Sequence, residues 1–210
     1  MPPSIPETMW AAQITAFNKP YTISTVNTPQ LRPNELLVKI HAAGFCHSDI
    51  QVRCGELNSP LSLIPSHEPV GTVVRVGKES ASKRKSAIGG SRKIYGKLDP
   101  RFCDHRDRGG FKNDGCFATY MVADSATTIA LPGSMSFEQG APLLCAGATV
   151  WGATNKARPF LQAGDPIGVI GAGGLGQLGV QLAKALGYRT VAIDSRDASL
   201  QLTDGMPTVL

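Results

Sequence analysis

The first half of the chain alternates short apolar runs with turn-forming residues, a pattern typical of β-strands. β-branched and aromatic residues are frequent in the runs, and Pro, Gly and Asn separate them. We expect strands over residues 10–14, 21–26, 35–44, 69–77 and 115–124. Several short strands with turn signals between them predict a β-barrel or sandwich.

The pattern changes near Ser136, where N-cap chemistry precedes a helical stretch that we expect to continue to Thr154. A short apolar strand is then predicted over 167–170, and a second over 190–194. Between them lie a glycine-rich turn and a helix with one apolar face. This order predicts one β-α-β unit. The apolar face consists of Leu175, Leu178, Leu182, Ala183 and Leu186.

Together the two patterns predict a β-rich domain followed by an α/β domain. With 210 residues and 22.2 kDa, the chain has room for one large domain or two small ones. We expect the β domain over residues 1–155. Residues 156–210 are expected to form part of a doubly wound parallel sheet, with a further helix beginning at 198–202.

Composition places the chain among ordinary globular proteins. Hydrophobic residues make up 42% of it, and no apolar run is long enough to span a bilayer. The N-terminus lacks the basic and apolar stretches of a secretory signal. Five irregularly spaced cysteines suit thiols or metal ligands better than a disulfide framework. We therefore expect a cytoplasmic protein without a membrane partner.

The formal charge of +5 is concentrated in one place. Residues 83–112 contain ten Lys or Arg and three Asp, and the rest of the chain is slightly acidic. The centre of this segment, about residues 80–102, has little apolar periodicity and is expected to be a loop. Because no aromatic residues stand among the basic residues of 82–93 for stacking on bases, we predict a solvated loop and no nucleic-acid partner.

The glycine-rich turn has the context of a dinucleotide site, since it follows a strand and opens a helix. It reads Gly171-Ala172-Gly173-Gly174-Leu175-Gly176. In such a turn the first glycine allows the bend, the second allows backbone to approach pyrophosphate, and the third allows close helix–strand packing. Asp194, at the end of the next strand, favours NAD over NADP, and Arg196 weakens that preference slightly. The alternative is a glycine turn used only for packing.

Three residues in separate contexts form a candidate metal site. Cys46 opens Cys46-His47-Ser48-Asp49, His67 precedes Glu68, and Cys145 follows two leucines. Two cysteines and one histidine leave a position open on Zn²⁺, as a catalytic zinc requires. Asp49 or Glu68 would orient a ligand, and Glu68 is also a candidate transient ligand. Spacing alone leaves buried thiols as an equal alternative.

These motifs, in this order, resemble the zinc-dependent medium-chain alcohol dehydrogenases, in particular the fungal and bacterial branch acting on short-chain alcohols. The resemblance covers about residues 9–80 and 102–202. It implies a GroES-like β-barrel followed by a Rossmann domain, with one catalytic zinc held by Cys46, His67 and Cys145. It further implies that His47 contacts the cofactor pyrophosphate and that Ser48 begins a proton relay.

The resemblance also implies an activity and an assembly. The expected reaction is hydride transfer between a primary or secondary alcohol, with its aldehyde or ketone, and NAD. Relatives of this kind are homo-oligomers, although their main interface lies in a region that has no counterpart in this chain.

Three departures from the family shape the expectation. Gln51 stands where a relay histidine is common, and an amide is no base at neutral pH. Only Cys103 matches the four cysteines of the family's structural zinc, so no structural zinc is expected, and a substitute involving His105 or Cys116 is disfavoured. The family also continues well beyond Asp194. We therefore expect a truncated or mis-joined chain with an incomplete parallel sheet and without normal turnover.

Two alternatives stay open from the sequence. One is a zinc-free enoyl or quinone reductase of the same superfamily that uses NADPH, against which Cys46 and Cys145 argue. The other is a zinc-binding remnant without enzymatic activity. Zinc content and cofactor titration separate these alternatives.

Overall fold

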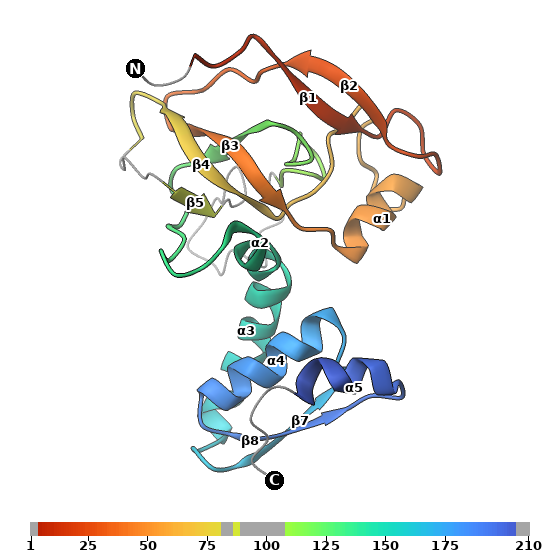
Figure 1. The fold of residues 1–210 in the computed structure, drawn as a ribbon, viewed down its shortest axis with the longest axis vertical. Helices are drawn as coiled ribbons and strands as arrows, with labels where there is room; N and C mark the ends of the chain where they lie inside the picture. The colour runs from red at the N-terminus through yellow and green to blue at the C-terminus, as the bar shows by residue number, and fades with distance from the viewer. Residues whose placement is uncertain (1–3, 81–85, 89–107, 205–210) are drawn as a thin grey trace. The chain divides into compact units, whose positions relative to one another are not determined.

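The computed structural model describes residues 4–80, 86–88 and 108–204, with side chains left out for 86–88 and 204. The chain forms two compact units, Met1–Leu144 and Cys145–Leu210 (Figure 1). The division between the two units lies between Leu144 and Cys145. The domain boundary expected between residues 155 and 156 stays a prediction.

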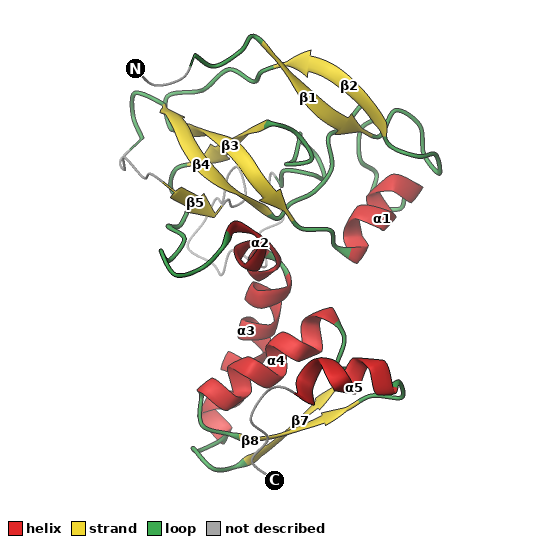
Figure 2. Cartoon of the chain, in the orientation of Figure 1, coloured by secondary structure: helices red, strands yellow, loops and turns green. Residues whose placement is uncertain are grey.

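The first unit is built from antiparallel strands (Figure 2). A four-stranded sheet has the order β5-β4-β3-β6, and β1 and β2 form a separate hairpin. Isolated bridges from Ala11 to Ala118 and from Ile14 to Leu63 tie the hairpin to the rest of the unit. The strands are β1 Thr8–Gln13, β2 Thr22–Asn27, β3 Glu35–Ala43, β4 Pro69–Val76, β5 Ser86–Ile88 and β6 Tyr120–Asp124.

The sequence pattern located most of these strands well, but it missed β5, which lies in the segment about 80–102 that was expected to be a loop and pairs with β4. It also misplaced the start of β6. The strand expected over 115–124 begins only at Tyr120. The residues before it pair with a loop instead: the backbone N–H groups of Gly115, Cys116 and Phe117 donate to the carbonyls of residues 64–66. These bonds have a consequence for the candidate site, because residue 66 directly precedes His67.

A helix that the apolar pattern did not predict follows β3. Helix α1, His47–Cys54, begins after the N-cap residue Cys46 and ends at Gly55, whose φ of 83° forms a left-handed C-cap. Val52 is its one fully buried apolar side chain. With so little apolar periodicity, the helix depends on its caps rather than on an amphipathic face.

The prediction of one continuous helix from Ser136 to Thr154 is wrong, because the helix is interrupted. The chain forms α2, Phe137–Gly140, then a 3₁₀ turn over Ala141–Leu144, and then α3, Ala146–Ala157. Pro142 explains the interruption, because proline has no N–H to continue the helical ladder and its ring clashes with the preceding turn. The predicted cap is confirmed, since Ser136 Oγ accepts a hydrogen bond from Gln139 N.

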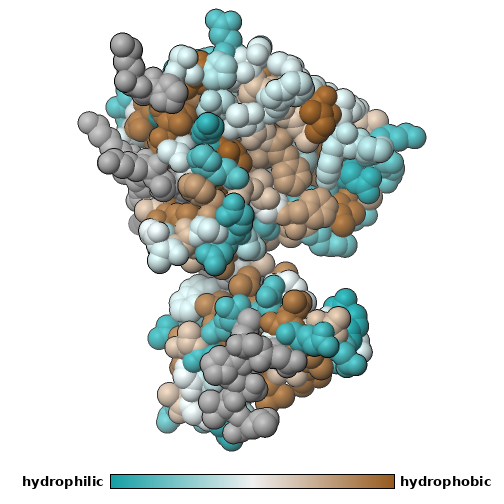
Figure 3. All heavy atoms as spheres, in the orientation of Figure 1, coloured by the Kyte–Doolittle hydropathy of each residue, from teal (hydrophilic) through white to brown (hydrophobic). Residues whose placement is uncertain are grey.

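The second unit contains the predicted β-α-β arrangement. Strands β7, Pro166–Ile170, and β8, Arg189–Ile193, are parallel, with helix α4, Gly174–Ala185, between them in the chain. Helix α5, Asp197–Asp204, follows. Helix α4 packs on both strands and on α3. Apolar side chains of the strands, including Ile170 and Val191, are exposed. Brown, hydrophobic patches are visible on the surface of this unit in Figure 3.

The longest helices of the described residues, α3 and α4, have 12 residues each. A helix needs about 20 apolar residues to cross a bilayer. No membrane-spanning helix is therefore present in the part of the chain that the structure describes.

Candidate metal and cofactor sites

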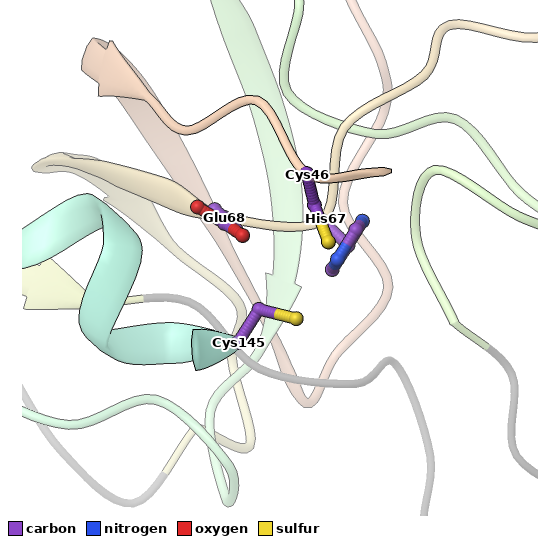
Figure 4. Close-up of side chains that lie close together, drawn as sticks. All are labelled: Cys46, His67, Glu68 and Cys145. Atoms are coloured by element: carbon purple, nitrogen blue, oxygen red, sulfur yellow. The ribbon is translucent and has the colours of Figure 1, made fainter. Parts of the chain in front are cut away.

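The structure brings the predicted metal ligands into one group. Ligand atoms of Cys46, His67, Glu68 and Cys145 all lie within 4.8 Å of one another. Cys46 caps α1, and His67 and Glu68 directly precede β4. Cys145 follows Leu144, which packs in the core of the first unit. Figure 4 shows the two sulfur atoms and the imidazole close together, with the carboxylate of Glu68 beside them.

This donor set fits a zinc ion. Bonds of about 2.0–2.3 Å to a tetrahedral ion place the donor atoms roughly 3.3–3.8 Å apart, and the observed group is close to that size. Two thiols, an imidazole and a carboxylate are all common zinc ligands. Both cysteines also precede the first turn of a helix, where free N–H groups favour negative charge. The geometry therefore suits the proposed ligands, with Glu68 as an exchangeable fourth.

Asp49 holds two of the ligand-bearing segments together. Its side chain is fully buried. Oδ2 accepts a hydrogen bond from Cys46 N at 2.8 Å, and Oδ1 accepts one from Ser66 N at 3.1 Å. One carboxylate thus fixes the backbone beside Cys46 and beside His67, as expected of a group that supports metal ligands.

The imidazole of His67 lies between a carboxylate and an aromatic ring. Its Nδ1 is buried, lies 3.5 Å from Asp49 Oδ1 and forms no hydrogen bond among the described residues. The ring also lies 4.7 Å from that of Phe111. An unpaired buried nitrogen beside a carboxylate is what a metal-binding histidine needs, because binding through Nε2 fixes the proton on Nδ1.

The other two residues of the Cys46 motif lie in the first turn of α1. Ser48 Oγ is 3.8 Å from Cys46 Sγ, at the edge of the donor group. His47 is exposed at the first position of the helix. The structure thus places Ser48 near the metal site, as its relay role requires. The contact of His47 with pyrophosphate stays a prediction.

Cys116 is close to this site but belongs to the core. It is 1% exposed, and burial raises the pKa of its thiol to about 12. Its Sγ donates to Ser66 Oγ at 3.0 Å. Cys116 is thus a hydrogen-bond donor within the core and is not a member of the donor group. Cys103 and His105, the other members of the disfavoured structural-zinc set, lie outside the described residues.

The raised pKa of Cys116 predicts a loss of stability in alkali. The folded thiol stays protonated up to about pH 12, whereas an unfolded thiol ionises near pH 8.5. The stabilisation is therefore complete below about pH 8.5 and is lost as pH rises toward 12, by about 1.4 kcal/mol per pH unit. Urea unfolding of the wild type and of Cys116→Ser at several pH values measures this contribution.

We expect the difference in unfolding free energy between these two proteins to shrink as pH rises, because serine does not titrate in this range. Cys54→Ser, which removes a half-buried thiol at the end of α1, is the matched control. If the unfolding free energies of the wild type and Cys116→Ser change in parallel with pH, the raised pKa of Cys116 is contradicted.

The glycine-rich turn adopts the geometry expected of its first and last glycines. Gly171 has a φ of 88°, and its N–H continues the pairing of β7 by donating to Ile193 O. A Cβ at Gly176 would overlap the carbonyl oxygen of Gly171. Gly176 therefore allows α4 to begin against the end of β7, as the motif predicts. Gly173 is the N-cap of α4, and Gly174 and Leu175 form its first turn.

Asp194 lies at the end of β8, beside the turn. Its Oδ2 accepts a hydrogen bond from Ala172 N at 2.8 Å, and this bond, more than any other interaction, lowers the pKa of the carboxyl. Arg196 contributes next, since its N–H donates to Oδ1 at 2.9 Å and its Nε lies 3.4 Å away. The aspartate is thus an ionised group tied to the glycine-rich turn, with a guanidinium next to it.

An apolar cavity of about 350 Å³ adjoins the turn within the second unit. It is bounded by α3, β7 and α4, with Val150, Ile170 and Leu175 among its lining residues. Sequence reasoning did not predict this cavity, because its walls come from elements that are separated along the chain.

Comparisons with known proteins bear on both sites. Residues 32–133 match the family described as the alcohol dehydrogenase GroES-like domain. An alcohol dehydrogenase from Geobacillus stearothermophilus is 34% identical over 207 residues, which cover 92% of this chain and 60% of that relative. The chain is similar to the alcohol dehydrogenases over most of its length. It spans about 60% of the length of the curated relatives that it matches.

Solved structures agree with this similarity. The acetophenone reductase from Geotrichum candidum NBRC 4597, in complex with NAD, has a TM-score of 0.84 at 27% identity, covering 99% of this chain and 64% of that one. The alcohol dehydrogenase from the archaeon Aeropyrum pernix has a TM-score of 0.83 at 29% identity, covering 95% and 63%. The GroES-like and partial Rossmann-like fold class predicted from the sequence is confirmed, as is the family resemblance.

Proposed function

We propose that this medium-chain dehydrogenase transfers a hydride between a primary or secondary alcohol and NAD with the help of one zinc ion. The observation that supports the proposal most strongly is the group of Cys46, His67, Glu68 and Cys145, whose ligand atoms lie within 4.8 Å of one another. Catalytic zinc sites in proteins commonly use three protein ligands and one exchangeable position. Here Glu68 would occupy that position until substrate replaces it.

Zinc in this site would polarise the alcohol oxygen and lower its pKa toward neutrality. The chain's own residues do the remaining work. Asp49 holds the backbone of Cys46 and Ser66 in place, and Ser48 takes up the proton that the alcohol loses. Gln51 lies one turn further along α1 and is no base at neutral pH. The proton therefore passes from Ser48 to solvent.

NAD is the cofactor that the second unit favours. The ionised carboxylate of Asp194 accepts hydrogen bonds and repels a 2′-phosphate, which supports NAD over NADP. Arg196 reduces this repulsion because its guanidinium lies beside the carboxylate. The NAD complex of the acetophenone reductase shows that a protein of similar fold binds this cofactor. We expect measurable but weaker binding of NADP.

We also propose a cytoplasmic location and assembly into a homo-oligomer, both of which follow from the family resemblance. No nucleic-acid or membrane partner is proposed. The predicted small-molecule partners are alcohols and their aldehydes or ketones.

The full chain loaded with zinc tests the proposal. We expect about one zinc ion per chain by elemental analysis and tighter binding of NAD than of NADP by calorimetry. Formation of NADH on addition of a primary or secondary alcohol, followed by absorbance, would support hydride transfer by this chain. Binding of NADPH without zinc would instead support a zinc-free reductase. Bound zinc without turnover would support a zinc-binding protein that lacks catalytic activity.

A further inference from the structure

Ser66 has an unusual backbone for a buried residue. Its φ is 72°, in the left-handed region that favours glycine, and its side chain is fully buried. A non-glycine residue in this region is strained and persists only where its surroundings hold it there. Since Ser66 directly precedes His67 and Glu68, its backbone conformation sets the direction from which both residues enter the metal site.

The hydroxyl of Ser66 is the centre of a short hydrogen-bonded chain. Cys116 Sγ donates to Ser66 Oγ at 3.0 Å, and Ser66 Oγ donates to Gly44 O at 2.8 Å. Gly44 lies two residues before Cys46, and its own N–H donates to Glu68 O at 3.1 Å. The hydroxyl thus connects the segment that carries Cys46 with the segment that carries His67 and Glu68.

The backbone of Ser66 is fixed from two further directions. Its N–H donates to Asp49 Oδ1, and its carbonyl accepts a hydrogen bond from Cys116 N at 3.0 Å. A Cβ at Gly110 or at Gly115 would lie against Ser66 O, so two glycines leave room for this carbonyl. The left-handed turn therefore has a partner at each of its polar atoms.

Asp49 and Ser66 act on different atoms of the same two segments. Asp49 joins Cys46 N to Ser66 N, whereas the Ser66 hydroxyl joins Gly44 O to the residue before His67. With both connections, neither segment can shift along the other without breaking a buried hydrogen bond. Loss of a buried hydrogen bond of this kind is destabilising, because the remaining partner is left unsatisfied.

We propose that Ser66 is a positioning residue of the metal site, whose buried hydroxyl sets the separation of Cys46 from His67 and Glu68. The inference rests on the proposed zinc function. The Ser66 hydroxyl then has a role that glycine cannot fill, although glycine is the residue best suited to this backbone conformation. The backbone strain at Ser66 is then tolerated because the side chain is needed for ligand geometry.

Cobalt binding to the full chain tests the proposal without reference to turnover. Co²⁺ replaces Zn²⁺ in thiolate and imidazole sites, and its visible absorption reports the affinity and symmetry of the ligand set. We expect Ser66→Ala and Ser66→Gly each to weaken Co²⁺ binding by about 10–100-fold, the range seen when groups that support metal ligands are removed. The visible bands of the bound ion should also change in position or intensity.

The two variants separate ligand positioning from simple stability. Ser66→Gly relieves the left-handed strain and is expected to unfold at a higher temperature than Ser66→Ala, yet to bind Co²⁺ as weakly. If Ser66→Ala does not fold, Ser66→Gly still provides the test. Ser62→Gly is the matched control, because Ser62 is an exposed serine with a φ of 63°. Its replacement should leave Co²⁺ affinity unchanged.

The outcomes also separate this inference from the proposed function. Wild-type affinity and an unchanged spectrum in Ser66→Gly would overturn the role of the hydroxyl while leaving the metal site intact. Failure of the wild-type chain to bind Co²⁺ or Zn²⁺ would instead overturn the proposed zinc function, and the role of Ser66 with it.

Discussion

Replacing Cys46 by serine is expected to abolish stoichiometric zinc binding. A serine hydroxyl stays protonated at neutral pH and is a much weaker zinc ligand than a thiolate, so the change removes one of three permanent ligands. We expect zinc affinity to fall by more than about 100-fold, beyond the range for residues that only support a ligand. Elemental analysis after dialysis and competition with a chromogenic chelator measure the loss.

Cys54→Ser is the control for this experiment. Cys54 is the last residue of α1, which Cys46 caps, but it is not a member of the donor group. The control should keep the zinc content of the wild type. Equal zinc affinity in wild type and Cys46→Ser would show that the group in Figure 4 is not the zinc site.

Replacing Gly176 by alanine is expected to disrupt the cofactor turn. The added Cβ would overlap the carbonyl oxygen of Gly171, a backbone atom that cannot rotate away. Either the start of α4 moves away from β7 or the turn changes its conformation. We expect a loss of about 1–3 kcal/mol in stability, as for overpacked cores. A marked rise in the dissociation constant for NAD should accompany it in calorimetry.

Gly168→Ala provides the comparison within the same unit. Gly168 lies in β7, and a Cβ there would have no neighbour within 4 Å. Its replacement should leave NAD binding unchanged, and stability unchanged or slightly raised, since glycine weakens strands. If both variants bind NAD equally well, the close approach of helix and strand at Gly176 has no role in cofactor binding.

Local sequence patterns predicted the elements whose signal is contained in adjacent residues. The two parallel strands, the helix between them and most strands of the first unit follow from apolar periodicity and turn residues. The pattern missed α1, because a short helix with one buried apolar residue, Val52, has almost no periodicity. The caps at Cys46 and Gly55 were the available signal for this helix. The signal was weak, because cysteine is not a usual N-cap residue.

The expected continuous helix after Ser136 failed for a different reason. The apolar pattern continues through residues 141–154, but Pro142 removes a backbone donor inside the first turns. Giving that proline more weight would have divided the helix. The resulting break also puts Cys145 at the N-cap of α3, which the continuous helix would not have done.

The candidate metal residues were named from motifs and family resemblance, but their arrangement depends on tertiary structure. Nothing in the spacing of Cys46, His67 and Cys145 shows that their ligand atoms converge. The positioning role of Ser66 was missed for the same reason, because its signal consists of contacts with Gly44 and Cys116. A serine before His67 where glycine would be less strained was the only local clue.

The donor residues come from three stretches of chain that are far apart in the sequence. An ion bound to Cys46, His67 and Cys145 would close two long loops of the chain at once. Holding the ends of a loop together lowers the conformational entropy of the chain when it opens, which disfavours unfolding. Zinc would then act as a reversible cross-link in a protein without disulfides among its described cysteines. Metal supply would thus govern resistance to unfolding and proteolysis as well as chemistry.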